Sequence, residues 1–310
     1  MMPKTFSDRP PSAPIVVGLG EVLWDVFDDE ARFGGAPANF ASHAAALGAQ
    51  AWVVSGVGQD PLGDRALDHL AAHGVQVDAV ARIPQAPTGS VQVRLDGHGS
   101  PHFTIHRHVA WDHIPWTDAT ADLAPRAEAV CFGTLAQREE ESRRTIQRFL
   151  DATRPDGWRV FDVNLRQDFY DRSVMEQSLR RCNVLKLSDE ELPVLARLFH
   201  LDELSDAAQL EQLIERFDLR LAVLTLGGRG ATLKDRSQTV SVQAEPVQVR
   251  DTVGAGDAFA ATITMGLLAD CDLRAIAEHA CRVAGYVCSQ DGAVPILPPA
   301  LRRLPVTDAR

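Results

Sequence analysis

The stretch VRDTVGAGDAFAA, residues 249–261, combines residue types that could bind and activate a phosphate. Gly254, Ala255 and Gly256 leave their backbone N–H groups unobstructed. They lead into the free N–H groups of a helix that we expect to begin near Asp257, and such a cup suits a transferring phosphoryl group. An acid at its rim could take the proton of an attacking hydroxyl. Asp257 could equally be a plain helix N-cap, a position that Asp often occupies.

Two common nucleotide-binding motifs are absent or broken. The sequence contains no Gly-Lys pair, which excludes a P-loop. GLGEVL (18–23) carries the first two glycines of a dinucleotide fingerprint, but Leu23 occupies the third position. We therefore do not expect the chain to bind NAD.

Short runs of strand-forming residues alternate with helical segments along the chain. The expected strands are 15–20, 51–57, 129–133, 158–164, 183–187 and 221–227. The expected helices are 37–47, 61–73, 138–153, 189–199, 206–217, 257–269 and 272–289. Several of the strands are continuous apolar runs, which is typical of a parallel sheet covered on both faces. The alternation predicts an α/β fold with a doubly wound, mostly parallel sheet.

Two segments interrupt this alternation. Residues 88–110 alternate polar and apolar side chains around a Gly-rich turn at 97–99, as an antiparallel hairpin with one solvated face does. Residues 21–33 also read as extended chain. We expect segments of about 21–35 and 88–112 to pair into a small antiparallel β lid, beside the sheet edge where such folds bind ligands.

The composition excludes several classes of function. Hydrophobic residues make up 45% of the 310 residues, and the net charge of −11 argues against nucleic-acid and anionic-membrane partners. The sequence lacks an apolar run long enough to cross a membrane, and its five scattered cysteines read as free thiols. We expect a cytoplasmic protein with a disordered tail at 1–14, one domain at 15–300 and a C-terminal tail at 301–310.

Several stretches resemble a known family. DTVGAGDAF (251–259) resembles the C-terminal signature of the ribokinase-like (PfkB) sugar and nucleoside kinases, and FGGAPANFASHAAALG (33–48) resembles their N-terminal signature. The resemblance extends over roughly residues 15–300. Within the family, the stretches GLGEVLWDVF, PTGSVQVRLDGHGSPHFTI, VAWDHI, FDVNLRQDFY and LKLSDEEL are similar to those of bacterial fructokinases.

The resemblance implies a chemical role for each group of residues. Asp257 would be the general base, and Gly254, Ala255 and Gly256 the anion hole. The residues implied for the sugar are Asp25, Gly34, Gly35, Asn39 and Asn164, with Arg166 on the phosphates. Those implied for the nucleotide are Thr225, Gly227, Gly228, Gly230, Ser188 and Glu191. ATP would arrive with Mg²⁺, Glu191 being associated with that metal, while Asp251 and Thr252 together with the loop at 289–294 would hold a monovalent cation such as K⁺.

Plainer structural roles compete with several of these assignments. Asp251 and Thr252 could form a turn, Gly34 and Gly35 could only turn the chain, and Asn39 could be an ordinary helix residue. Arg166 could sit in a surface salt bridge.

The nucleotide assignments have plainer alternatives as well. TLGGRG (225–230) could be a tight turn into a hairpin. Ser188 stands where the family usually has Asn, which puts metal affinity in question, and Ser188 with Glu191 also fits a capping box.

The alternating histidines His102, His106 and His108 lack a further ligand for a metal site, so a solvated or sugar-facing strand is expected there.

The resemblance therefore implies an ATP-dependent sugar kinase, with D-fructose converted to fructose 6-phosphate. The alternatives are a kinase for another sugar or sugar acid, such as ribose or 2-keto-3-deoxygluconate, and a non-catalytic sugar or nucleotide sensor on the same fold. Its partners would be a small sugar and ATP, and an exposed lid edge would allow two copies to pair.

Overall fold

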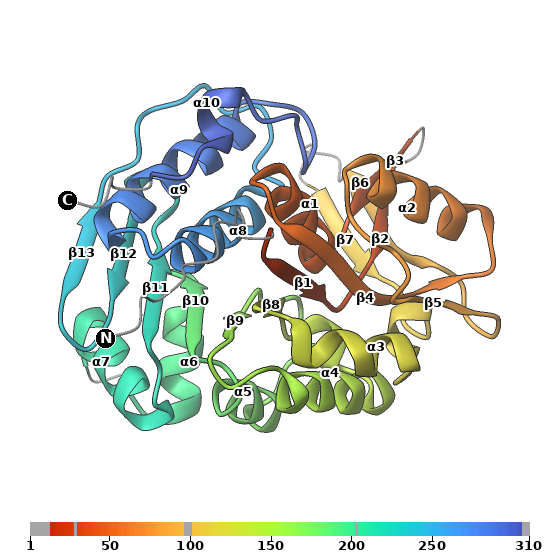
Figure 1. Cartoon of the computed structure of the whole chain (residues 1–310), viewed down its shortest axis with the longest axis horizontal. Coiled ribbons are helices and arrows are strands. Elements are labelled where there is room, and N and C mark those ends of the chain that lie inside the picture. Colours follow the sequence, from red (N-terminus) through yellow and green to blue (C-terminus); the bar gives the residue numbers. More distant parts are fainter. Residues whose placement is uncertain (1–12, 28–29, 96–100, 202–203, 306–310) are drawn as a thin grey trace, which may run out of the picture.

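A computed structural model of the chain describes residues 13–27, 30–95, 101–201 and 204–305. It consists of a nine-stranded sheet covered by helices and a separate four-stranded sheet at one end (Figure 1). Most of the two expected tails and the expected turn at 97–99 lie outside the described residues.

The large sheet is parallel over seven of its nine strands. Its strands, in sheet order, are β13 (Thr239–Val242), β12 (Ala231–Lys234), β11 (Leu221–Thr225), β10 (Val184–Ser188), β9 (Trp158–Asp162), β8 (Ala129–Phe132), β1 (Ile15–Leu19), β4 (Gln50–Gly58) and β5 (Val80–Ile83). The antiparallel strands β12 and β13 complete one edge. The predicted doubly wound, mostly parallel sheet is confirmed.

Helices cover both faces of this sheet, as its apolar strands require. On one face lie α1 (Ala36–Ala46), α2 (Pro61–Ala72), α8 (Ala255–Leu268) and α9 (Leu273–Cys288). On the other lie α3 (Asp118–Leu123), α4 (Glu140–Ala152), α5 (Arg172–Leu179), α6 (Leu192–Phe199) and α7 (Asp206–Phe217). Successive residues of β1 point to opposite faces, so Val16 packs in the first core and Val17 in the second.

The remaining elements are short, and the outer helices are well solvated. Short 3-10 turns are η1 (Ala110–His113), η2 (Ala124–Arg126), η3 (Leu135–Gln137) and η4 (Gly227–Arg229), and α10 (Pro299–Arg302) lies near the C-terminal end.

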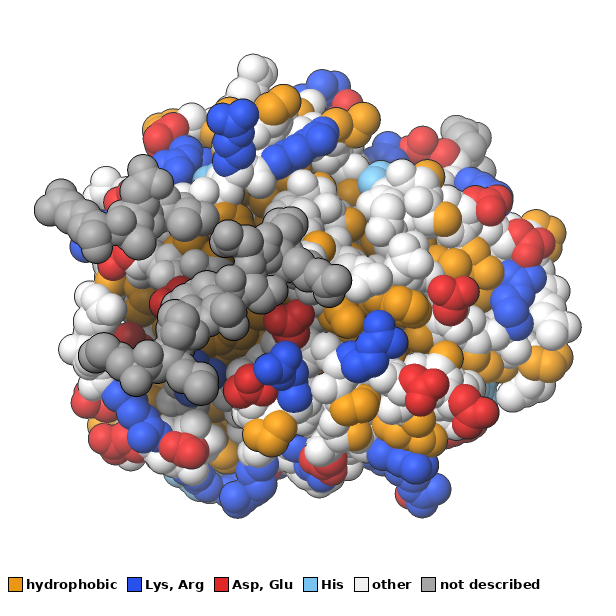
Figure 2. Space-filling view, in the orientation of Figure 1, with side chains coloured by type: hydrophobic (Ala, Val, Ile, Leu, Met, Phe, Trp, Pro, Cys, Tyr) orange, Lys and Arg blue, Asp and Glu red, His pale blue; other side chains and the backbone are white. Residues whose placement is uncertain are grey.

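Acidic and basic side chains are interspersed over the visible face of the molecule (Figure 2). Ion pairs one helical turn apart join Arg144 to Glu140 on α4, and Arg180, just after α5, to Glu176. Within the described ranges, every helix is too short or too polar to cross a lipid bilayer.

The predicted lid is a four-stranded sheet in the order β3-β2-β6-β7. Its strands are β2 (Leu23–Val26), β3 (Ala31–Gly34), β6 (Gly89–Leu95) and β7 (Pro101–Ile105). Two antiparallel hairpins, β2–β3 and β6–β7, form it, and they join through a parallel pairing of β2 with β6. The two segments that interrupt the strand–helix alternation therefore do meet in space.

Three details differ from the sequence predictions. Strands β5, β12 and β13 and helices α3, α5 and α10 were not expected, because each is short and its pattern is weak. Helix α6 begins at Leu192 rather than at 189, after a turn at 189–191. Helix α8 begins at Ala255, two residues before the expected start.

Candidate active site

A cavity of about 600 Å³ lies between the lid, the carboxyl ends of the central strands and the first turn of α8. It brings together most of the residues that the sequence assigns to the sugar and to phosphoryl transfer. Its polar and glycine lining is Glu21, Asp25, Gly34, Gly35, Asn39, Asn164, Arg166, Gln167, Lys186, Thr252, Gly254, Gly256 and Asp257. The nucleotide residues proposed at 188, 191 and 225–230 lie outside this lining, at the ends of β10 and β11.

The start of α8 has the geometry of an anion-binding cup. Gly254 is the N-cap residue, in a left-handed conformation with φ 78°. A Cβ at this position would lie 2.3 Å from the carbonyl oxygen of Ala293, so only glycine fits. The first turn of α8 therefore presents its free backbone N–H groups beside the cavity.

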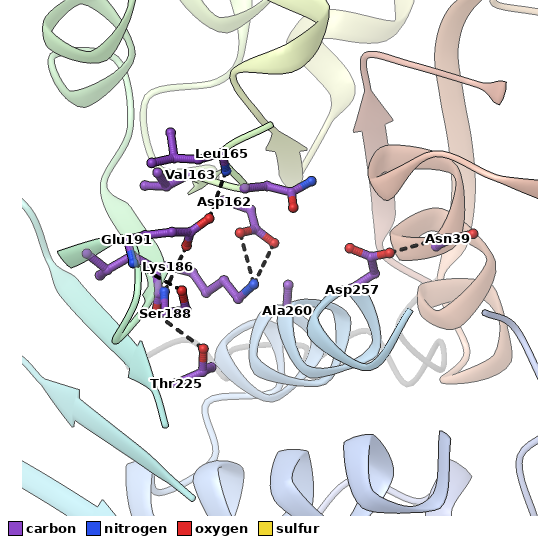
Figure 3. Close-up of polar contacts among 12 residues, drawn as sticks. Asn39, Asp162, Val163, Leu165, Lys186, Ser188, Glu191, Thr225, Asp257 and Ala260 are labelled. Carbon is purple, nitrogen blue, oxygen red and sulfur yellow. Dashed lines mark hydrogen bonds and ion pairs between the residues drawn. The ribbon is translucent and has the colours of Figure 1, made fainter. Parts of the chain in front are cut away.

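Asp257 is the third residue of α8, and the helix shows no side-chain cap at Gly254. The plain N-cap role that the sequence left open for Asp257 is therefore wrong. Its carboxylate instead accepts a 2.8 Å hydrogen bond at Oδ2 from the side-chain amide of Asn39, on α1 (Figure 3). Within the described chain no hydrogen bond reaches Oδ1, and Asp257 lines the cavity.

Asn39 is buried, and its Oδ1 has no hydrogen-bond partner in the described structure. Helix α1 begins directly after Gly35, which brings the Asn39 amide to the cavity wall. One amide can thus hold Asp257 with its nitrogen and accept a hydrogen bond from a ligand with its oxygen.

Asp25 lies in β2 on the cavity wall, where it pairs with Arg32 of β3, and Gly34 lies two residues further along β3, opposite Leu23. A Cβ on Gly34 would approach Asp25 Oδ2 to 3.1 Å, so glycine keeps that carboxylate accessible. Burial raises the pKa of Asp25 to about 6, partly offset by the positive charges of Arg166 and Arg32.

Glu21 is a cavity residue that the sequence reasoning missed. It is 2% exposed, and its Oε2 has no hydrogen-bond partner among the described residues. Burial raises the pKa of Glu21 to about 7, against the opposing charge of Arg166. A Cβ on Gly35, whose φ is 108°, would lie 2.5 Å from the Glu21 carbonyl oxygen. The only sign of this in the sequence is that an acid, Glu21, stands among apolar residues and glycines just after a strand, in GLGEVL.

The loop after β9 presents Asn164 and Arg166 to the cavity. Asn164 is left-handed with φ 42°, a conformation that Asn tolerates better than most residues. Arg166 is exposed, and its hydrogen bond goes to the carbonyl oxygen of Leu165 rather than to an acidic partner. The guanidinium is thus free to meet an anionic group at the cavity mouth.

Lys186 and Asp162 form a buried ion pair, which sequence reasoning also missed. Lys186 Nζ lies 2.9 Å from both Asp162 oxygens, and the two side chains are 10% and 6% exposed. The two residues are direct partners in the parallel register of β9 and β10 (Figure 3). The signal that could have identified them is an acid at the end of one buried strand, WRVFD, and a lysine within the next, NVLKL.

Ser188 and Glu191 make the reciprocal hydrogen bonds of a capping box. The Ser188 N–H donates to Glu191 Oε2 at 2.8 Å, and the Glu191 N–H donates to Ser188 Oγ at 3.3 Å. Glu191 Oε1 also accepts from the Leu165 N–H at 2.8 Å, which fixes the loop after β9. Both carboxylate oxygens of Glu191 thus accept hydrogen bonds from backbone N–H groups. Its role at a metal stays a prediction.

TLGGRG forms the connection between β11 and the antiparallel strand β12, so the hairpin reading is part of the structure. Gly230 has φ 106°, and a Cβ at this position would lie 2.0 Å from the Val242 carbonyl oxygen. Cβ positions at Gly227 and Gly228 would meet no atom within 4 Å. Thr225 hydrogen-bonds the Leu187 carbonyl oxygen. The two glycines leave open space beside the strand ends, where a nucleotide could approach.

The two loops expected to hold a monovalent cation do lie together. Asp251 Oδ2 accepts a 3.3 Å hydrogen bond from the N–H of Gly292, and Oδ1 accepts one from Val253. In the described ranges no group of three His, Cys, Asp or Glu side chains is arranged to bind a metal. His106 and His108 are exposed, and the side chain of His102 lies outside the described part of the structure.

Known proteins with similar sequences are carbohydrate kinases. A model of the pfkB family carbohydrate kinases matches residues 14–300. A fructokinase of Klebsiella pneumoniae is 34% identical over 266 residues, covering 81% of this chain and 83% of the relative. The structure of the Xylella fastidiosa fructokinase with bound ATP is similar in fold, with a TM-score of 0.81 at 24% identity over 92% and 95% of the two chains. The Vibrio cholerae O395 fructokinase in its fructose, ADP and calcium ion bound form gives 0.77 at 25% identity, over 94% and 98%.

Proposed function

The chain belongs to the pfkB family of carbohydrate kinases, and on that premise we propose that it is a fructokinase, which transfers the γ-phosphoryl group of ATP to the 6-hydroxyl of D-fructose. The observation that carries the proposal is the position of Asp257. Its carboxylate lines the cavity at the third residue of α8, one turn or less from the N–H groups of the anion cup.

This arrangement accounts for the chemistry step by step. Asp257 Oδ1 takes the proton of the sugar hydroxyl while that oxygen attacks the γ-phosphorus. The bond from phosphorus to the β–γ bridging oxygen breaks, and ADP leaves with the electron pair. The N–H groups around Gly254 and Gly256 stabilise the charge that gathers on the phosphoryl oxygens. A positioned base of this kind contributes about 10²–10⁴-fold to the rate.

The charges of the cavity favour a neutral sugar over a sugar acid. Glu21, Asp25 and Asp257 bring three carboxyl groups to the cavity wall. Hydroxyl groups donate to carboxylates, whereas a substrate carboxylate would be repelled by those that are ionised, such as Asp25 above its pKa of about 6. Arg166, in the loop after β9, also lines the cavity, but it is exposed and its charge partly offsets that of Asp25. A neutral polyhydroxy substrate therefore fits this wall better than 2-keto-3-deoxygluconate does, and the fructokinase relatives support fructose among neutral sugars.

Two metal ions belong to the proposal. Mg²⁺ would arrive bound to the ATP phosphates, where it would supply neutralising charge and retain several of its waters. Asp251, Thr252 and the 289–294 loop offer carboxylate, hydroxyl and carbonyl oxygens close together, a donor set that suits K⁺. Asp251 and the neighbouring loop also stabilise the backbone before Gly254.

Release of ADP from ATP and Mg²⁺, measured over a panel of acceptors with and without K⁺, tests this function. The panel contains fructose, ribose, glucose, 2-keto-3-deoxygluconate and adenosine. We expect a clear preference for fructose. Turnover with another acceptor alone would support the kinase activity but refute the assignment of fructose as the substrate. ATP binding with no turnover on any acceptor would favour a non-catalytic sensor.

A further inference from the structure

The buried pair of Lys186 and Asp162 lies directly beneath the anion cup. Asp162 is the last residue of β9, and Lys186, two residues before the end of β10, is its register partner. Burying two charges costs several kcal/mol that a well-packed apolar pair would not require. A lysine here is also unusual for this chain, which contains only three lysines. The pair therefore calls for a role beyond packing.

Lys186 reaches the cavity from below Gly256. It belongs to the cavity lining, and a Cβ on Gly256 would lie 3.1 Å from Lys186 Nζ. Lys186 and Asp162 lie between the strand ends and the first turns of α8, on the side of α8 that carries Asp257 (Figure 3). The ammonium group is thus next to the residues that form the cup.

The hydrogen bonding of Lys186 is incomplete. An ammonium group has three donors, and the described structure gives two of them to Asp162. Burial lowers the pKa of Lys186, but the carboxylates of Asp162, Glu191 and Asp257 outweigh it, and the pKa is raised. Burial raises the pKa of Asp162 to about 6. Both partners are therefore charged at neutral pH, with one donor left for a ligand.

The charge balance of the cavity makes a buried cation useful. Three carboxyl groups, those of Glu21, Asp25 and Asp257, already line the wall. A transferring phosphoryl group adds negative charge beside them, and Arg166 is exposed at the mouth. A compact ammonium on a rigid strand, in a site shielded from water, stabilises such charge more than an exposed guanidinium does.

We propose that Lys186 is a catalytic residue that donates a hydrogen bond to the phosphoryl group during transfer, with Asp162 as the counter-ion that positions its ammonium under Gly256. The inference rests on the proposed kinase function. The positive charge that stabilises the phosphoryl group would then come partly from the Lys186 side chain, in addition to the backbone N–H groups of α8.

The test compares Lys186→Met with a matched control, Lys234→Met. Lys234 lies in β12 of the same sheet, outside the cavity, so its loss should affect neither binding nor turnover. The measurements are kcat with fructose and the dissociation constants of ADP alone and of ADP with fluoroaluminate and fructose, a mimic of the transferring phosphoryl group. We expect Lys186→Met to lower kcat about 10²-fold or more and to weaken the fluoroaluminate complex similarly. ADP alone should bind within about threefold of the wild type, because it lacks the γ-phosphoryl group.

A double variant, Asp162→Asn with Lys186→Met, separates chemistry from folding. It removes both charges, so it should recover the melting temperature lost by Lys186→Met while kcat stays low. Recovered turnover in the double variant would overturn the proposal, because the harm would then come from an unpaired Asp162. Equal weakening of ADP and of the fluoroaluminate complex would also overturn it. If the wild type phosphorylates no acceptor, the proposed function alone fails, and the two binding constants still decide the role of Lys186.

Discussion

Asn39 Nδ2 donates a 2.8 Å hydrogen bond to Asp257 Oδ2, joining two residues that lie 218 positions apart in the chain. The bond links the first turn of α1 to the first turn of α8, so it couples the N-terminal and C-terminal halves of the site. In the proposed mechanism it leaves Oδ1 of Asp257 as the oxygen that acts as the base. A carboxylate held at one oxygen points the other at the reacting hydroxyl without an entropy cost at the moment of reaction.

Replacing Asp257 by Asn should abolish most turnover and leave binding intact. The amide keeps the size of the side chain but cannot accept a proton, so we expect kcat to fall at least about 10²-fold. Calorimetric titration should give ATP and fructose affinities close to those of the wild type. Turnover near the wild-type rate would show that another group is the base.

Asn39→Ala should lower kcat about tenfold to 10²-fold by releasing Asp257 from its fixed orientation. If Asn39 acts through Asp257, the double variant with Asp257→Asn should lose no more activity than Asp257→Asn alone. Ser42→Ala is the matched control, because Ser42 is also buried on α1 but bonds to the Ala38 carbonyl oxygen. A fully additive double variant would contradict the positioning role.

Asp25 should make sugar binding depend on pH. Its pKa is raised to about 6, so its carboxylate becomes neutral as the pH falls below that value and loses acceptor capacity for sugar hydroxyls. We expect the dissociation constant of fructose to rise between pH 7 and pH 5 in the wild type, and to be higher but less pH-dependent in Asp25→Asn. ATP affinity should change little with this substitution. Equal weakening of both ligands would refute a sugar-binding role for Asp25.

Much of this site was predictable from local sequence. The strand–helix alternation gave the parallel sheet, and two stretches with family signatures placed Asn39 and Asp257 on helices that meet. Glycine positions were informative because backbone conformation is a local property, as at Gly254 and Gly35. These features depend on a few neighbouring residues, which is why one sequence suffices to predict them.

The features that were missed depend on register and burial. Lys186 reads as one polar residue in an apolar strand until β9 is paired with β10, when it meets Asp162. Glu21 follows a broken glycine motif, and only the packing of Gly35 against its backbone shows that it is buried. The start of α8 was misplaced by two residues because Ala255 lies between two glycines, Gly254 and Gly256, and glycine is a poor helix former.

Gly254→Ala should damage both folding and catalysis. A left-handed conformation costs a non-glycine residue about 1–2 kcal/mol, and the added Cβ would lie 2.3 Å from the Ala293 carbonyl oxygen. We expect a lower melting temperature and a large fall in kcat. Gly228→Ala is the control, since its Cβ would meet no atom within 4 Å, and its melting temperature should be unchanged. Equal losses of melting temperature in the two variants would show that the conformation of Gly254 is unimportant.

Glu21→Gln should stabilise the protein at high pH. The pKa of Glu21 is raised by burial to about 7, so the folded state favours the protonated acid and opposes its ionisation. Stability from the protonated form is fully present below the unfolded pKa of about 4.5 and is lost as the pH rises through 7. The neutral amide escapes this loss, which amounts to at most about 3 kcal/mol. Denaturant unfolding at pH 5 and pH 8 should show Glu21→Gln gaining more on the wild type at pH 8 than at pH 5, whereas the exposed Glu215→Gln should show no such difference. A gain of equal size at both pH values would mean that Glu21 is not titrating in the folded cavity.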